Sequence, residues 1–179
     1  VAIDAGTTKI KAGLVDIDGR LIDLVSVDND VISPFAGAFE MDMDKVWDKV
    51  CAATKELTGR NQDSEKDIAG LGITGQGDGL WPIDDSGKPI RNAILWNDTR
   101  TKHMKLEMEG KIHELAVHQR VTPVFPGAAS VLLKWLIEKE PESARKVSYI
   151  LHCKDWLNFN FLTENVLNQI PDIFRIFDL

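Results

Sequence analysis

The opening stretch VAIDAGTTKIKAGLVDIDGRLIDLVSV, residues 1–27, decides the fold of this chain. Apolar residues run through 1–4, 11–15 and 21–27, and the breaks between these runs are rich in Gly, Thr and Asp. Short apolar runs separated in this way predict three strands joined by tight turns, with a hairpin loop at 16–19 that ends in Gly. The chain therefore starts as three consecutive strands.

Helical and extended patterns alternate beyond these strands. After a loop over 28–41, apolar positions at helical spacing from Asp44 predict a helix that ends near Gly59. A glycine-interrupted apolar run at 68–74 predicts a buried strand. The later segments predict, in order, a hairpin at 80–90, a strand at 93–96, a charged helix over 101–119, a helix at 130–139, a strand at 147–151 and a helix capped by Asp155 that runs to Phe161. This order predicts a mixed α/β domain.

Composition limits the function classes. The chain has 179 residues and a net charge of -7, which predicts one domain whose surface is not built to bind nucleic acid or anionic lipid. It contains no apolar run near the roughly 20 residues that a membrane helix needs. Cys51 and Cys153 lie far apart without a Cys-x-x-Cys motif, so we expect reduced thiols in a cytoplasmic protein rather than a zinc site.

The first candidate site follows the first strand. Gly6 permits a sharp turn after Asp4, and the backbone amides and hydroxyls of Thr7 and Thr8 can then face a phosphate. Asp4 could hold Mg²⁺ through water, and Lys11 supplies a positive charge near the same turn. The pattern is not a P-loop, and an ordinary β-turn with a capping Asp remains the alternative.

A second candidate site is the glycine-rich loop 75–79, which ends an apolar strand. Gln76 offers an amide and Asp78 a carboxylate, while Gly77 leaves the backbone between them bare. Amide and carboxylate groups suit a ligand rich in hydroxyls, because they donate to and accept from neighbouring OH groups. The alternative is a glycine-rich turn in which Asp78 caps its own backbone.

The third candidate site is the segment 96–100, at the end of another short strand. Asn97, Asp98 and Arg100 could orient a polyhydroxylated substrate, with Trp96 as an apolar wall. The alternative is a helix N-cap formed by Asn97 or Asp98, with Arg100 solvated on the first turn.

Taken together, these motifs resemble the FGGY carbohydrate kinases in order and spacing. Two smaller motifs support the resemblance, which extends from residue 1 to about Thr163. The matching patterns are Asp4-x-Gly6-Thr7-Thr8-x-x-Lys11, Gly72-Ile73-Thr74-Gly75-Gln76, Ala93-Ile94-Leu95-Trp96-Asn97-Asp98-x-Arg100, Asp42-Met43-Asp44 before Trp47, and Lys154-Asp155-Trp156-Leu157.

The resemblance implies a ribonuclease H-like fold of the actin and hexokinase type, and ATP-dependent phosphorylation of a sugar or polyol. It implies that residues 1–163 form the N-terminal kinase domain and that 164–179 are a tail, which could follow an omitted segment. The second domain, with its catalytic Asp, is absent, so the isolated chain should be inactive and contributes no catalytic residue of its own.

The same resemblance assigns ligands to the three candidate sites. ATP is expected against Asp4, Gly6, Thr7, Thr8 and Lys11, with Mg²⁺ on Asp4. The sugar or polyol is expected against the other two sites: Gln76, Gly77, Asp78, Trp96, Asn97, Asp98 and Arg100.

The substrate branch follows from Gly77 and Asp78. D-xylulose-type kinases usually carry Met-His there and glycerol kinases Arg-Glu, so the chain looks more like the L-xylulose and erythritol-type kinases. The expected partner is then a small sugar or polyol, and we expect no binding to nucleic acid or to a membrane. A homodimer is possible. An actin-like or Hsp70-like ATPase and a non-catalytic sugar-binding relative are the alternatives.

Overall fold

The computed structural model describes residues 1–61, 68–104 and 125–162. Most of the expected charged helix over 101–119, and the expected tail, lie outside these described residues. Among the helices within the described ranges, none combines the length and the apolar character that crossing a membrane would require.

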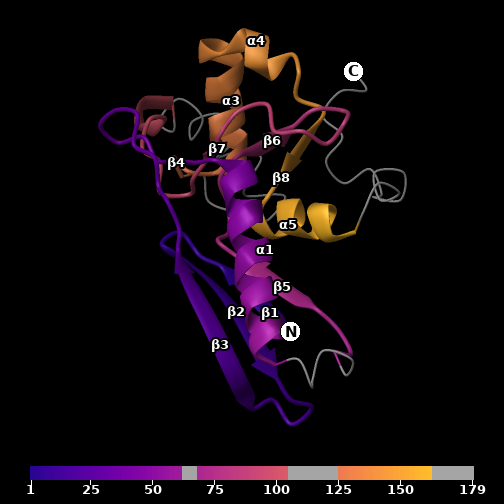
Figure 1. The fold of residues 1–179 in the computed structure, drawn as a ribbon. Helices are drawn as coiled ribbons and strands as arrows, with labels where there is room; N and C mark the ends of the chain where they lie inside the picture. Colours follow the sequence, from indigo (N-terminus) through magenta and orange to yellow (C-terminus); the bar gives the residue numbers. More distant parts are fainter. Residues whose placement is uncertain (62–67, 105–124, 163–179) are drawn as a thin grey trace, which may run out of the picture.

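A four-stranded mixed sheet forms the centre of the fold (Figure 1). Its strands are β1 (Ala2–Ala5), β2 (Lys9–Val15), β3 (Leu21–Asp28) and β5 (Gly72–Gly75), arranged in the order β3-β2-β1-β5. The first three strands are antiparallel neighbours, as the opening sequence predicts, whereas β5 runs parallel to β1. Parallel pairing brings the ends of β1 and β5 to the same edge of the sheet.

Alternation along the strands buries one face of this sheet. The side chains of Ile3, Ile10 and Ala12 are buried, while Lys11 between them is exposed. Helix α1 (Met43–Arg60) packs on β2 and β3 and buries Met43, Val46, Val50, Ala53 and Leu57. Its first turn is capped by Asp42, whose side chain accepts a hydrogen bond from the Lys45 amide at 3.1 Å.

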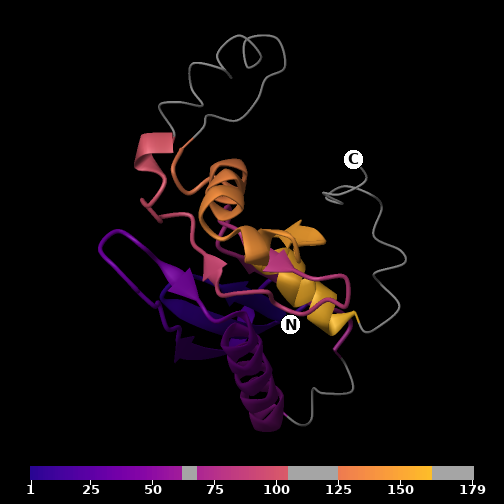
Figure 2. The ribbon, with the colours of Figure 1, turned by 90° about the horizontal axis from the view of Figure 1, so that it is seen from above.

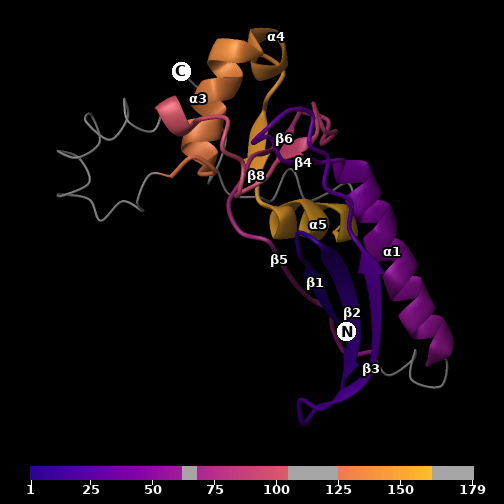
Figure 3. The same cartoon turned by 90° about the vertical axis from the view of Figure 1, so that its left-hand side faces the viewer.

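Within the described residues, a second part of the fold carries two small antiparallel sheets and three helices. In Figures 1 and 3, helices α3 and α4 lie at the opposite end of the molecule from the β2–β3 hairpin, and Figure 2 shows α3 well apart from α1. A separate core cluster that includes Leu80, Ile94 and Leu132 lies in this part, whereas Trp81 of β6 and Trp156 of α5 belong to the main core together with Ile3 of β1. Its elements are β4 (Glu40–Met41) paired with β7 (Ala93–Ile94), β6 (Trp81–Ile83) paired with β8 (Tyr149–Leu151), and α3 (Ala129–Lys139), α4 (Pro141–Ala144) and α5 (Cys153–Phe161).

Several elements differ from the sequence prediction. The loop expected over 28–41 ends in the strand β4, because Glu40 and Met41 pair with β7, and the strand expected at 93–96 is limited to β7. In the hairpin expected at 80–90, β6 pairs with the distant β8 and forms only an isolated bridge to Pro89. The strand expected over 68–74 is limited to β5 and is only partly buried, because β5 is an edge strand of the sheet. Helix α5 begins two residues before Asp155, with His152 as the N-cap residue. The Asp155 carboxylate accepts a hydrogen bond from the His152 amide at 3.1 Å, so it stabilises the helix start from inside the first turn.

The two cysteines are free thiols, as expected. Cys153 is buried, and its Sγ lies 3.8 Å from the carbonyl oxygen of Ala5 at the end of β1. Burial, with smaller contributions from the charges of Asp155 and Asp4, raises the pKa of the Cys153 thiol to about 12. The thiol is therefore protonated at neutral pH and serves as a small apolar group in the core.

Candidate functional site

The turn 6–8 joins β1 to β2 and has the geometry of an anion-binding loop. The Gly6 amide donates to the Lys9 carbonyl at 2.9 Å, and a Cβ on Gly6 would lie 3.0 Å from that same oxygen. The amides of Thr7 and Thr8 make no hydrogen bond to any residue that the structure describes. Two neighbouring free amides on a tight turn are suited to bind a phosphate oxygen.

Asn29, just beyond β3, holds this turn from the side of the hairpin. Its Nδ2 donates to the Gly6 carbonyl at 2.9 Å, and its backbone amide donates to the Thr8 carbonyl at 2.8 Å. These two hydrogen bonds fix both ends of the turn, so Asn29 belongs to the candidate site. The sequence pattern did not single it out, because Asn29 lies in a stretch that reads only as a loop.

The three sequence motifs meet at the edge where β1 and β5 end. Trp96 Nε1 donates to Thr7 Oγ1 at 3.2 Å, and Thr7 Oγ1 donates to Gln76 Oε1 at 3.2 Å. The backbone amide of Gln76 also donates a hydrogen bond to the Ala5 carbonyl at 3.0 Å. Gln76 and Trp96 lie 69 and 89 positions after Thr7 in the sequence, and the Thr7 hydroxyl joins them. The expected phosphate loop and the two expected sugar loops form one site.

The loop that carries Asp78 has a constrained backbone. Asp78 adopts φ 52°, the only positive φ at a non-glycine residue within the described ranges. Gly79 follows at φ 83°, and a Cβ there would lie 2.6 Å from the Ile94 carbonyl oxygen. The Asp78 side chain is exposed and accepts no hydrogen bond from the described residues, which argues against a backbone-capping role. Its carboxylate is free to meet a ligand.

The segment 96–100 splits into an exposed part and a buried part. The side chain of Trp96 is exposed and Asn97 is half-buried, whereas Asp98 and Arg100 have side chains that are 0% and 2% exposed. Asp98 accepts hydrogen bonds from the Arg100 amide at 2.8 Å and from Arg100 Nε at 3.0 Å. The side chain of Arg100 is therefore buried, in contrast to the solvated side chain that the N-cap alternative expects.

Glu40 completes this buried ion-pair network. Arg100 Nη2 lies 2.8 Å from Glu40 Oε1, and Arg91 donates to the same carboxylate oxygen. The Asp98 carboxylate also accepts the Phe39 amide at 2.7 Å, and the Arg100 guanidinium lies 4.6 Å from the ring centre of Trp135. These contacts connect the segment 96–100 to Phe39, Glu40 and Trp135, which lie far away in the sequence, so the network fixes this segment against the rest of the fold.

Electrostatics in this network favour the charged arginine. Burial by itself would lower the pKa of Arg100, but the hydrogen bonds and charges of Asp98 and Glu40 outweigh it and raise that pKa above its ordinary value. The guanidinium is thus a permanent cation that neutralises two buried carboxylates.

Gly127 adds a steric constraint on the position of Trp96. Gly127 packs so closely on Trp96 that a Cβ at this position would overlap the Trp96 carbonyl group. Its own carbonyl accepts a hydrogen bond from the Gly79 amide at 3.1 Å. Gly127 therefore brings the loop of Asp78 and the segment of Trp96 together without a side chain between them.

Asp4 and Lys11 lie on the face of the sheet opposite to α1. In the strand register Asp4 is directly opposite Lys11 on β2 and directly opposite Thr74 on β5. Lys11 and Thr74 are exposed and Asp4 is half-buried, so this face is a polar surface beside the turn 6–8. Thr74 is a further candidate that the sequence motif contained but that we did not single out.

The donor set fits ATP with Mg²⁺ better than a protein-enclosed metal. Within the described ranges, no cluster of three or more His, Cys, Asp or Glu side chains could hold a metal ion. Asp4 supplies one carboxylate, which suits Mg²⁺ because that ion keeps several waters and takes its other ligands from phosphate. Lys11 and the free amides of the turn suit the phosphates.

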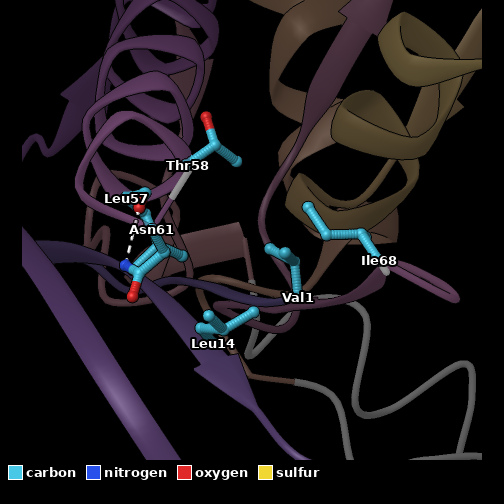
Figure 4. Close-up of a pocket in the computed structure, with 6 residues that line it drawn as sticks. All are labelled: Val1, Leu14, Leu57, Thr58, Asn61 and Ile68. Carbon is cyan, nitrogen blue, oxygen red and sulfur yellow. Dashed lines mark hydrogen bonds between the residues drawn. The ribbon is translucent and has the colours of Figure 1, made fainter. Parts of the chain in front are cut away.

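The apolar pocket in Figure 4 is not part of this site. It is lined mainly by carbon atoms near the C-terminal end of α1, and Asn61 donates there to the Leu57 carbonyl at 2.9 Å. The turn 6–8 is instead linked through Asn29 to Met41, just before the N-terminal end of the helix. An 18-residue helix is about 27 Å long, so the pocket and the site are far apart.

The fold and the phosphate-type turn define an α/β domain of the actin-like ATPase class. Residues 1–173 match the model of the FGGY family of carbohydrate kinases, N-terminal domain. The chain belongs to this family, which confirms the resemblance and the fold class predicted from the motifs.

Curated and solved relatives agree with this assignment. The chain is 35% identical over 161 residues to a probable L-xylulose kinase of Pasteurella multocida, covering 89% of this chain and 33% of that protein. It is 30% identical to the L-xylulose/3-keto-L-gulonate kinase of Escherichia coli, covering 89% of this chain and 32% of that protein. The crystal structure of a xyloylose kinase from Brucella ovis superposes with a TM-score of 0.80 at 29% identity, over 87% of this chain and 32% of that one. The chain thus spans about a third of the length of these relatives.

Proposed function

We propose that this chain supplies the first phosphate loop and the sugar-contacting half of an ATP-dependent carbohydrate kinase, which phosphorylates a hydroxyl of a sugar or polyol. Residues 1–163 are the N-terminal domain in this proposal, and a second domain of the full-length protein supplies the catalytic Asp. The observation that carries the proposal is the chain of hydrogen bonds from Trp96 through Thr7 to Gln76, which joins a phosphate-type turn to two loops rich in polar groups.

The nucleotide belongs on the turn 6–8 and the adjoining sheet face. The free amides of Thr7 and Thr8 and the exposed ammonium of Lys11 bind the phosphates, and Asp4 holds hydrated Mg²⁺. When bound, ATP would supply the γ-phosphoryl group, and Mg²⁺ would neutralise the negative charge that develops during its transfer. The residues of this chain position the phosphates and keep the turn rigid.

The sugar belongs beside Gln76, Asp78 and Trp96. Gln76 and Asp78 offer hydrogen bonds to neighbouring hydroxyls, and the exposed Trp96 ring forms an apolar wall. Gly77 adds no side chain, and the half-buried Asn97 lies beside Trp96. This set fits a ketopentose of the L-xylulose type or a related polyol of four to six carbons, in line with the names of the relatives.

In this proposal Asp98 and Arg100 support the sugar site without contacting the sugar. Their side chains are almost fully buried and pair with each other and with Glu40, so they hold Trp96 and Asn97 in place. This role differs from the direct sugar contact that the motif suggested, because solvent and a ligand in solution reach Trp96 but not the guanidinium of Arg100.

A substrate screen tests the proposed function. The full-length protein is incubated with ATP, Mg²⁺ and a panel of three- to six-carbon ketoses, polyols and sugar acids, and ADP release is measured. We expect sugar-dependent turnover with a ketopentose or polyol, and none from the 179-residue chain alone, because in this proposal the second domain supplies the base for the attacking hydroxyl. ATP turnover that is independent of every sugar would favour an actin-like or Hsp70-like ATPase instead.

Replacing Asp78 by asparagine tests the sugar contact. The Asp78→Asn variant should lower kcat/KM for the preferred substrate by about 10- to 100-fold, since hydrogen bonds to a charged group contribute about 1.5–3 kcal/mol. Asp85→Asn, at an exposed position on the turn after β6, is the matched control and should behave as the wild type. An unchanged kcat/KM in Asp78→Asn would remove Asp78 from the proposed sugar site.

A further inference from the structure

The hydroxyl of Thr7 is fully used by the two sugar loops. It accepts a hydrogen bond from Trp96 Nε1 and donates its proton to Gln76 Oε1, with both distances at 3.2 Å. A threonine hydroxyl has one proton to donate, so this arrangement leaves none for a phosphate oxygen. The amides of Thr7 and Thr8, rather than the Thr7 hydroxyl, are the free donors of the turn.

The same turn is held from its other side through Met41. Gln76 Nε2 donates to Met41 Sδ at 3.1 Å, and Asn29 Nδ2 lies 3.6 Å from the same sulfur and 2.9 Å from the Gly6 carbonyl oxygen. Met41 is completely buried, so this sulfur is a fixed point in the core. Gln76 thus contacts the turn directly through Thr7 and indirectly through Met41 and Asn29.

These contacts form a closed ring that runs from Thr7 to Gln76, Met41 and Asn29 and back to the turn at Gly6. The ring connects the phosphate turn to the expected sugar loop of Gln76. The Trp96 side chain is 47% exposed, and the hydrogen bond from Trp96 to Thr7 lies at the surface of the site. A surface hydrogen bond between two side chains competes with water, so it contributes little net free energy in the free protein. A ligand that orders Trp96 and Gln76 would therefore also order Thr7.

We propose that Thr7 is a positioning residue that couples the sugar site to the phosphate site, so that sugar and nucleotide bind cooperatively. The inference rests on the proposed function. A hydroxyl-rich ligand against Gln76 and Trp96 holds both side chains in the orientation in which they bond to Thr7, which fixes the free amides of the turn for the nucleotide. By linkage, the nucleotide strengthens sugar binding by the same factor.

The test is a measurement of the coupling factor in the full-length protein. Calorimetry gives the dissociation constant of a non-hydrolysable ATP analogue, first alone and then with a saturating concentration of the sugar identified by the screen. The ratio of these constants is the coupling factor, and any direct contribution of Thr7 to nucleotide binding cancels in it. We expect a wild-type factor of about 5 to 150.

The Thr7→Val variant keeps the shape of the side chain and removes both hydrogen bonds. Its coupling factor should fall at least about threefold below that of the wild type, because Thr7 is the direct link from Trp96 and Gln76 to the turn. The indirect link through Met41 and Asn29 is unchanged in this variant. Thr7→Ser retains the hydroxyl and should restore the factor. Trp96→Phe removes only the donor of the first hydrogen bond and keeps the bond from Thr7 to Gln76, so it should lower the factor by a smaller amount. This variant tests the role of Thr7 even if Thr7→Val does not fold.

Thr8→Val is the matched control, because Thr8 is the exposed neighbour in the same turn and its side chain makes no hydrogen bond to the described residues. This variant should keep the wild-type coupling factor whatever its effect on nucleotide affinity. A wild-type factor of one, a wild-type factor in Thr7→Val, or an equal loss in Thr8→Val would overturn the inference. If no sugar in the screen is a substrate, the proposed function itself fails, whereas turnover with intact coupling in Thr7→Val rejects only the role of Thr7.

Discussion

The variant in which alanine replaces Arg100 is expected to unfold with a free energy about 3–5 kcal/mol below that of the wild type. The guanidinium is the cation between Asp98 and Glu40, at 2.9 Å and 2.8 Å, and all three side chains are less than 10% exposed. Its removal leaves the Asp98 carboxylate buried without a cation. Chemical denaturation followed by tryptophan fluorescence measures the difference.

An exposed ion pair provides the control for this prediction. Arg145 pairs with Glu142 on the surface, where its side chain is 69% exposed, so Arg145→Ala should cost less than about 1 kcal/mol. If Arg100→Ala is no less stable than Arg145→Ala, the buried network does not support the fold. Arg100→Lys separates charge from geometry, because lysine keeps the charge but cannot reproduce the paired contacts of Nε and Nη2 with the two oxygens of Asp98.

The elements that the sequence predicted well are those that depend on neighbouring residues. The alternation of Ile10, Lys11 and Ala12 sets one face of β2 toward the core, and the apolar spacing from Val46 to Leu57 sets one side of α1. Each pattern is complete within a few helical turns or a few strand residues, so the local sequence is sufficient to predict the element and its buried face. The same holds for the turn at Gly6, which the structure places next to Lys9 as a sharp connection.

The parts that were missed depend on contacts between distant segments. Glu40 and Asn29 lie in a stretch without periodicity, and their partners Arg100 and Gly6 are 60 and 23 residues away. Asp98 has the local pattern of a helix cap, and it does accept the amide two residues on. Asp98 is nevertheless buried and accepts a hydrogen bond from the distant Phe39 amide at 2.7 Å, a contact that no local sequence pattern indicates.

The candidate site consists of an upper layer of residues near the surface and a lower layer of buried residues. The motif residues Thr7, Gln76 and Trp96 meet near the surface, while Glu40 and Asp98 are buried beneath them. Substitutions in the upper layer should therefore change kinetic constants, and those in the lower layer should first change stability. Lys11 belongs to the upper layer and offers the sharpest kinetic test.

Replacing Lys11 by alanine in the full-length protein should lower kcat by about 30- to 900-fold, with little change in the KM for the sugar. The exposed ammonium faces the same side of the sheet as Asp4 and makes no ion pair within the described residues, so it is available to the phosphates. Charge on the transferring phosphoryl group grows in the transition state, and loss of such a cation costs about 2–4 kcal/mol. Steady-state kinetics with ATP and the preferred sugar measures both constants.

Lys9→Ala is the matched control, because Lys9 lies two residues earlier on the same strand and face and loses the same charge. Its ammonium is already paired with Asp28 at 2.6 Å on the exposed edge strand β3, away from Asp4. The Lys9 variant should therefore keep kcat within about threefold of the wild type, since exposed pairs contribute less than about 1 kcal/mol. Equal losses in both variants would show a general effect of surface charge, and a Lys11 variant with normal kcat and a raised sugar KM would place this lysine at the sugar instead of the phosphates.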